Sequence, residues 1–136
     1  PEDMKCYGVH DAEAVGKIFE PLGNRSRKLK SPKAYLASYY KFNVDAGYAI
    51  EVNFYGDAIE YKCIKGPGNG IVDIVLDGEP HGQLDLYAAK EFFDVTGFRK
   101  DRLKHGLHTL RIISTGKKNE NSHGTAMTFN AANVRN

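Results

Sequence analysis

The sequence contains no tryptophan and only two cysteines and two methionines among its 136 residues. Without tryptophan, any aromatic ring that stacks against a ligand has to come from the eight tyrosines or the seven phenylalanines. Cys6 and Cys63 are compatible with one disulfide and equally with two free thiols. The cysteines therefore leave the redox compartment open.

Features of membrane and nucleic-acid-binding proteins are also missing. No apolar run approaches the ~20 residues that a membrane-spanning helix needs, and a net charge of +2 does not argue for nucleic acid or an anionic membrane. The basic run at residues 24–30 has no interleaved aromatic residue, which favours a solvated loop. The chain begins at Pro1 without a signal peptide, which predicts a mature form or an excised piece.

Catalytic motifs are absent as well. The sequence has no Gly-x-Ser-x-Gly elbow, no His-Glu-x-x-His and no phosphate-binding loop, because the glycine-rich residues 66–70 are not followed by Lys-Ser or Lys-Thr. Asp73, Asp77 and Asp85 lie close together in sequence and could suggest a glycosidase pair. Asp77, however, precedes Gly78 in a turn, where Asp is favoured for local hydrogen bonding. We therefore expect no enzymatic activity.

The histidines do not have the spacing of a metal site. On a strand, His105 and His108 point to opposite faces, so they do not share a transition metal, and His108 is expected to be a hydrogen-bonded structural residue. No cofactor is required. A structural calcium ion, bound by backbone carbonyls and a few Asp or Asn oxygens, fits the composition, with Asp11, Asp45 and Asn130 as candidate ligands.

Short alternating segments dominate the rest of the chain. In residues 70–78, Val72, Ile74 and Leu76 fall on one face, and the run ends in Asp-Gly, which is typical of a strand followed by a tight turn. Further strands are predicted at residues 17–22, 34–42, 48–55, 58–64, 83–87, 91–97, 107–114 and 125–134, with loops at 65–70 and 116–124. This spacing predicts one antiparallel β-sandwich domain over residues 1–136, with residues 1–34 assigned only loosely.

A series of motifs follows the same order along the chain. They are residues 56–61, 70–78, 85–87 and 106–110, then Thr115-Gly116 with Asn119, Ser122 and Gly124. Over residues 35–134 they resemble the jelly-roll, galactose-binding-domain-like carbohydrate-binding module appended to secreted bacterial glycoside hydrolases and sialidases. In that family Trp is usual at the position of Tyr61, and Asp near that of Asn130.

The resemblance implies a non-catalytic carbohydrate-binding module of a larger extracellular or cell-surface protein, with a glycan and a tethered catalytic domain as partners. Two alternatives stay open. One is a structural or protein-interaction spacer without a sugar site, and the other is a piece of an esterase or glycosidase whose catalytic domain lies elsewhere.

A sugar site needs an aromatic ring that stacks on the pyranose and polar groups that bind the hydroxyls. We expect such residues on loops that converge at one end of the sandwich. The candidates are Tyr61, Tyr87, Asn69, His81, Arg99, Asn119, Asn121 and His123. The two tyrosines could equally be half-buried sheet residues, and Asn119 could serve only its own turn.

Overall fold

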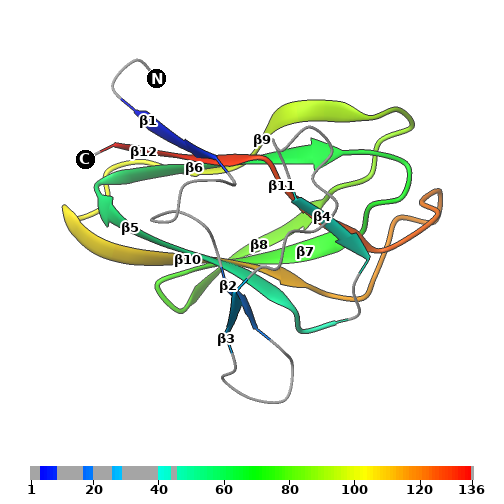
Figure 1. Cartoon of the computed structure of the whole chain (residues 1–136), viewed down its shortest axis with the longest axis horizontal. Coiled ribbons are helices and arrows are strands. Elements are labelled where there is room, and N and C mark those ends of the chain that lie inside the picture. Colours follow the sequence, from blue (N-terminus) through cyan, green and yellow to red (C-terminus); the bar gives the residue numbers. More distant parts are fainter. Residues whose placement is uncertain (1–3, 9–16, 20–25, 29–39, 44–45, 136) are drawn as a thin grey trace.

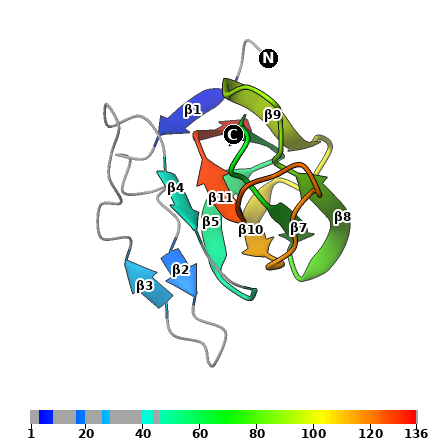
Figure 2. The ribbon, with the colours of Figure 1, turned by 90° about the vertical axis from the view of Figure 1, so that its right-hand side faces the viewer.

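The computed structural model describes residues 4–8, 17–19, 26–28, 40–43 and 46–135. These residues form a jelly-roll β-sandwich of two antiparallel sheets packed face to face (Figures 1 and 2), which confirms the predicted fold class. The described residues contain no helix of the length and apolarity needed to cross a membrane.

The first sheet has four strands. In spatial order they are β1 (Lys5–Gly8), β12 (Ala131–Arg135), β6 (Ala58–Lys65) and β9 (Phe92–Lys100). Every pairing within it is antiparallel, and β6 and β9 pair with two register shifts. This sheet forms the upper layer in Figure 1.

The second sheet has six strands and forms the lower layer in Figure 1. In spatial order they are β3 (Ser26–Lys28), β2 (Lys17–Phe19), β5 (Ala49–Gly56), β10 (Gly106–Ser114), β7 (Ile71–Leu76) and β8 (Glu79–Asp85). The expectation that the basic run forms only a solvated loop is therefore wrong for Ser26–Lys28, which pair with β2. The strand predicted at residues 17–22 is β2, which is paired with β3 on one side and β5 on the other.

The core lies between the two sheets and follows the alternation in the sequence. Val72, Ile74 and Leu76 of β7 are buried, as predicted, because successive strand residues point to opposite faces. Each such side chain contributes about 1.5–3 kcal/mol when fully buried. The largest fully buried hydrophobic side chains come from both sheets, from β11 and, at Leu86, from the segment after β8: Tyr61, Phe129, Ile50, Ile59, Ile64, Leu86, Leu110, Ile112 and Met127.

The turn between β7 and β8 consists of Asp77 and Gly78. Their φ angles are 51° and 81°, so both central residues are left-handed, as in the type I′ turn that Asp-Gly favours. The turn residues predicted from the sequence are thus confirmed, and β8 begins directly after them at Glu79.

The last predicted strand, at residues 125–134, is divided into two. β11 (Ala126–Phe129) pairs with β4 (Tyr40–Asn43), and β12 pairs with β6 and β1 in the four-stranded sheet. The break falls at Asn130, whose backbone N–H donates to the Lys62 carbonyl at 2.8 Å. Polar and apolar residues are mixed without a strict alternation in this run, so the pattern does not show where such a break lies.

Both cysteines are free thiols. Cys63 is fully buried on β6, whereas Cys6 on β1 is exposed. Burial raises the pKa of the Cys63 thiol to about 11, so it stays protonated and unreactive near neutral pH.

We expect the two cysteines to differ sharply in reactivity. A thiol reagent should modify Cys6 in the native protein and reach Cys63 only after denaturation. The measurement is absorbance titration with an aromatic disulfide reagent, with and without guanidinium. If Cys63 reacted as fast as Cys6 in the native state, its buried placement would be wrong.

A second prediction concerns Gly56, at the end of β5. A Cβ there would overlap the backbone carbonyl of Arg135, which cannot move without disturbing β12. Gly56→Ala should therefore lower the free energy of unfolding by about 2 kcal/mol, as overpacking does. Gly106 pairs with Gly56 and has no atom near its Cβ position, so Gly106→Ala is the matched control. Equal urea midpoints for the two variants would contradict this prediction.

Candidate ligand-binding face

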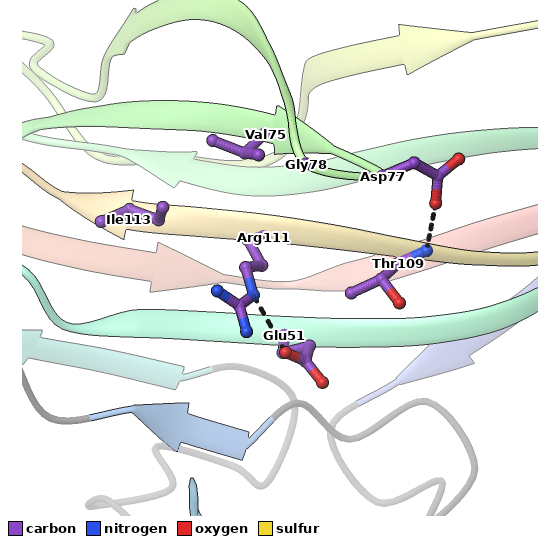
Figure 3. A pocket seen from close by; sticks show the side chains of 7 residues that line it. All are labelled: Glu51, Val75, Asp77, Gly78, Thr109, Arg111 and Ile113. Atoms are coloured by element: carbon purple, nitrogen blue, oxygen red, sulfur yellow. Dashed lines mark hydrogen bonds and ion pairs between the residues drawn. The ribbon is translucent and has the colours of Figure 1, made fainter. Parts of the chain in front are cut away.

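A hollow of about 600 Å³ lies on the outer face of the six-stranded sheet (Figure 3). Strands β7 and β10, the β7–β8 turn and one residue of β5 form it. Its lining residues are Glu51, Val75, Asp77, Gly78, Thr109, Arg111 and Ile113. This volume is within the range of about 300–1,000 Å³ that small-molecule sites occupy.

Strand alternation explains why these side chains share one face. β5 buries Ile50, Val52 and Phe54, so its intervening residues point outward. The register then sets Arg111 opposite Glu51, Thr109 opposite Asn53 and Leu107 opposite Tyr55. Three successive cross-strand pairs therefore line the outer face of β5 and β10.

The polar pairs form a continuous hydrogen-bond network. The Arg111 Nε donates to Glu51 Oε2 at 3.0 Å, and the Asn53 amide donates to Glu51 Oε1 at 3.1 Å. The Thr109 hydroxyl donates to Asn53 Oδ1 at 2.8 Å. This face therefore presents a guanidinium, an amide, a hydroxyl and a carboxylate, the groups that bind sugar hydroxyls.

The aromatic end of the same face consists of Tyr55, His105 and Leu107, which we call the platform. The Tyr55 residue is 54% exposed and Leu107 is 80% exposed. The His105 ring lies edge-on to the Tyr55 ring, with centroids 4.9 Å apart. Tyr55 thus offers an accessible ring next to the Asn53–Thr109 pair.

His108 holds the β7–β8 turn at the edge of the hollow. Its Nδ1 lies 2.6 Å from Asp77 Oδ2, and its Nε2 lies 2.6 Å from the Lys104 carbonyl oxygen. A carbonyl and a carboxylate both accept, so both ring nitrogens donate when His108 is in its protonated, imidazolium form. The ring also stacks on Phe54, with centroids 5.3 Å apart, which confirms the predicted hydrogen-bonded structural role.

The ionisation of this pair follows from its contacts. Burial of His108 opposes its charge, but the hydrogen bonds to Asp77 and the Lys104 carbonyl outweigh burial and raise the pKa of His108. Burial likewise acts to raise the pKa of Asp77, but the bonds from His108 and the Thr109 N–H lower it overall. Because both nitrogens of His108 are engaged, it is not placed to act as a general base.

Two of the predicted site residues are buried, and for them the prediction is wrong. The Tyr61 ring is 0% exposed within the core, and its hydroxyl donates to the Thr128 carbonyl, so it cannot stack on a ligand. Asn69 is also 0% exposed, and its amide donates to the Ile64 carbonyl at 2.9 Å. Alternation already places Tyr61 on the same side as Ile59 and Cys63.

Four other predicted residues do meet at one end of the sandwich. Tyr87 is bridged to Gly66, and Asn119 donates to Asp85 Oδ2 at 3.0 Å. Asn121 and His123 are exposed in the loop that follows β10. The loops converge as predicted, but the Asn119 amide is engaged by Asp85 and its Oδ1 accepts from the Asn121 N–H, so it also stabilises its own turn.

His81 and Arg99 lie away from that loop end. The His81 ring packs edge-on against Phe98, with centroids 5.5 Å apart, where β8 and β9 approach. Arg99 pairs with Asp101 at 3.2 Å and lies 4.0 Å from Glu60, its cross-strand partner on β6 in the four-stranded sheet. These residues do not share a site with Tyr87 or with the hollow.

The described residues do not assemble a metal site. They contain no group of three or more His, Cys, Asp or Glu side chains that could hold an ion. The Asn130 Oδ1 already accepts from the Asp94 N–H at 2.7 Å. Asp11 and Asp45 lie outside the described residues, so the structural calcium ion stays a prediction.

Residues of the hollow and the platform were not among the predicted site residues. The alternation of Glu51, Asn53 and Tyr55 with apolar residues could have revealed this surface from the sequence. An aromatic and two polar side chains that point outward from one strand indicate a candidate binding face as strongly as polar residues on loops do. The partner row, Leu107, Thr109 and Arg111, requires the β5–β10 register, which the sequence does not give.

Comparison with known proteins yields similarity of fold. No family model and no curated protein matches the sequence. A Paenibacillus xanthan lyase structure matches 98% of this chain and 12% of its own, at 18% identity and a TM-score of 0.51. This match supports the β-sandwich fold.

Two further structures have lower TM-scores. A family two carbohydrate esterase from Clostridium thermocellum in complex with cellohexaose is 23% identical over 74% of this chain and 28% of its own, with a TM-score of 0.46. The carbohydrate-binding module CBM36 in complex with calcium and xylotriose is 16% identical over 97% and 92%, with a TM-score of 0.39. The chain thus spans 12% of the length of the xanthan lyase and 28% of the length of the esterase.

The His108–Asp77 pair makes stability depend on pH. The raised pKa means that the folded protein holds the proton more tightly than the unfolded chain, whose His titrates at about 6.5. The stabilisation is therefore complete below that pH and is lost as pH rises through the higher pKa of folded His108. The lowered pKa of Asp77 adds stability above about pH 4 that is lost as pH falls further.

We expect His108→Gln to lower the free energy of unfolding by about 1–3 kcal/mol at pH 6, the contribution of charge-assisted hydrogen bonds. The deficit should shrink towards alkaline pH, measured by urea unfolding at a series of pH values. His123→Gln is the control, because His123 is exposed. A deficit that is the same at every pH would show that the charge on His108 contributes nothing.

Proposed function

We propose that this chain is a single-domain, non-catalytic carbohydrate-binding module whose site is the outer face of β5, β10 and β7. The observation that carries the proposal is the row of side chains from Tyr55 through Asn53–Thr109 to Glu51–Arg111, next to the hollow of about 600 Å³. An exposed ring beside a line of hydrogen-bonding groups is the arrangement that a pyranose chain requires.

Each group has a role in this arrangement. The Tyr55 ring stacks against the apolar face of one sugar, and Leu107 extends that contact. Thr109, Asn53 and Arg111 bind hydroxyls of the next sugar, over the hollow. Affinities from about mM to µM, or roughly 4–8 kcal/mol, are expected for such a shallow site.

The fold supports this function by analogy only, because one sandwich can carry many functions. The match to a segment of a xanthan lyase, an enzyme named for its action on a polysaccharide, agrees with it. We infer further that the module belongs to a larger extracellular protein and keeps a tethered catalytic domain close to its glycan through a raised effective concentration.

The alternative site is the loop end, where Tyr87, Asn119, Asn121 and His123 meet. The alternative function is a structural spacer, which would leave both faces without ligand.

Phe92 is 53% exposed on β9, almost the same as Tyr55, and it lies in the other sheet. Phe92 is therefore a matched control for the loss of an exposed ring.

The experiment is a glycan-array screen with calcium present, followed by titration calorimetry on each hit. Tyr55→Ala should raise the Kd by about tenfold, because stacked aromatic contacts contribute roughly 1–1.5 kcal/mol each. Phe92→Ala should leave the Kd unchanged.

Other outcomes would redirect or reject the proposal. A loss of binding with Tyr87→Ala but not with Tyr55→Ala would move the site to the loop end. A silent array, with the wild-type protein shown to be folded by circular dichroism, would reject carbohydrate binding and leave the spacer.

A further inference from the structure

The connection between β9 and β10 carries a concentration of positive charge next to the platform. Three exposed cations lie within five residues: Lys100, Arg102 and Lys104, which we call the basic loop. Arg99 and Arg135 lie at the same end of the sandwich, since the Asp101 carboxylate is affected by both. Arg99 and Arg135 are paired with Asp101 and Asp57, so the excess positive charge at this end comes from the basic loop.

The carboxylates at this end are already paired. Arg99 binds Asp101 with its Nε and one terminal nitrogen, both at 3.2 Å. The hydrogen bonds from Arg99, with the charges of Arg135 and Arg102 nearby, lower the pKa of Asp101. Arg135 binds Asp57 at 2.8 Å. Among the described residues, Lys100, Arg102 and Lys104 have no carboxylate within ion-pair distance.

The backbone of the basic loop is fixed at two points. The Leu103 N–H donates to the Asp57 carbonyl at 2.9 Å, and the Leu103 side chain packs against the core. The Lys104 carbonyl accepts from His108. Arg102 has a φ of 58°, a left-handed conformation that a non-glycine residue keeps only where its surroundings impose it. The loop therefore presents its cations from a defined backbone.

The basic loop continues directly into the platform. Lys104 is followed by His105, whose ring contacts Tyr55, and then by Gly106 and the exposed Leu107. A sugar stacked on Tyr55 would thus lie next to ammonium and guanidinium groups. In the hollow, by contrast, the Arg111 charge is paired with Glu51 and the Asp77 charge with His108.

We propose that the basic loop makes this module selective for acidic glycans, that is, saccharides carrying carboxylate or sulfate groups. The inference rests on the proposed function, because the same Tyr55 stacking holds the sugar. Lys104 and Arg102 bind the anionic substituent of the stacked sugar, and Lys100 adds to the attraction at longer range. Neutral glycans bind through the platform and hollow alone.

The test compares hexagalacturonate, which carries a carboxylate on every sugar, with neutral cellohexaose by titration calorimetry at two salt concentrations. The wild-type protein should bind hexagalacturonate about tenfold more tightly at low salt, and added salt should remove most of this preference. Its affinity for cellohexaose should not change with salt.

The variant that tests the residues combines Lys100→Gln, Arg102→Asn and Lys104→Gln, with Asn chosen because it tolerates the left-handed conformation. Its Kd for hexagalacturonate should rise about tenfold, as expected for the loss of two exposed charge contacts and of a third charge nearby. The control carries Lys90→Gln, Lys117→Gln and Lys118→Gln, which make the same charge change at the opposite end of the sandwich.

Each outcome separates this inference from the proposed function. Equal binding of both hexasaccharides, unaffected by the basic-loop variant, would overturn acidic selectivity and leave carbohydrate binding intact. Equal losses of hexagalacturonate affinity in the basic-loop variant and in the control variant would show that only the net charge of the protein matters. That result would also overturn selectivity by the basic loop. Tighter binding of duplex DNA, or of phosphatidylserine vesicles, than of hexagalacturonate would assign the basic loop to another polyanion. No binding of either hexasaccharide would reject both proposals. If the basic-loop variant does not fold, the salt dependence of wild-type binding to the two hexasaccharides tests acidic selectivity without it.

Discussion

Both the core and the candidate ligand face depend on the antiparallel pairing of β10 with β5 on one side and β7 on the other. This register buries Leu110 and Ile112 against Ile50, Val52 and the apolar residues of β7. Because the side-chain period of a strand is two, the same register turns Tyr55, Thr109 and Arg111 outward in aligned rows. A slip of one residue would bury the polar rows and expose the core, so folding and the site are set by one constraint.

The sequence alone was sufficient for most of the sandwich and for little of the site. Alternation and turn residues predicted β5, β6, β7 and β10 almost to their ends, and Asp77-Gly78 predicted the left-handed turn. The break at Asn130 could not be predicted, because Ala126–Phe129 and Ala131–Arg135 are both nearly continuously buried and differ only in which sheet they join. Which strands pair depends on contacts between residues far apart in the sequence, and the local pattern of residues does not specify these contacts.

The site residues divide for the same reason. The loops predicted at 65–70 and 116–124 do lie at one end, together with the segment between β8 and β9, and there Tyr87, Asn119, Asn121 and His123 meet. Tyr61 shows the opposite case, since its alternation with Glu60 and Lys62 assigns it to the core side, whereas its closeness in sequence to the loop at 65–70 made it a site candidate. Tyr55 became a candidate only when its pairing with Leu107 and its contact with His105 were known.

The hydrogen bonding of the ligand face also limits how tightly it can bind. Glu51, Asn53, Thr109 and Arg111 already hydrogen-bond to one another, so a sugar hydroxyl competes with these bonds and with water. Such an exchange contributes little net free energy per bond, about 0.5–1.5 kcal/mol at most. Most of the affinity must then come from the Tyr55 ring and from the charges of the basic loop. A face of this kind gains by being tethered next to its polymer, where effective concentration compensates for weak individual contacts.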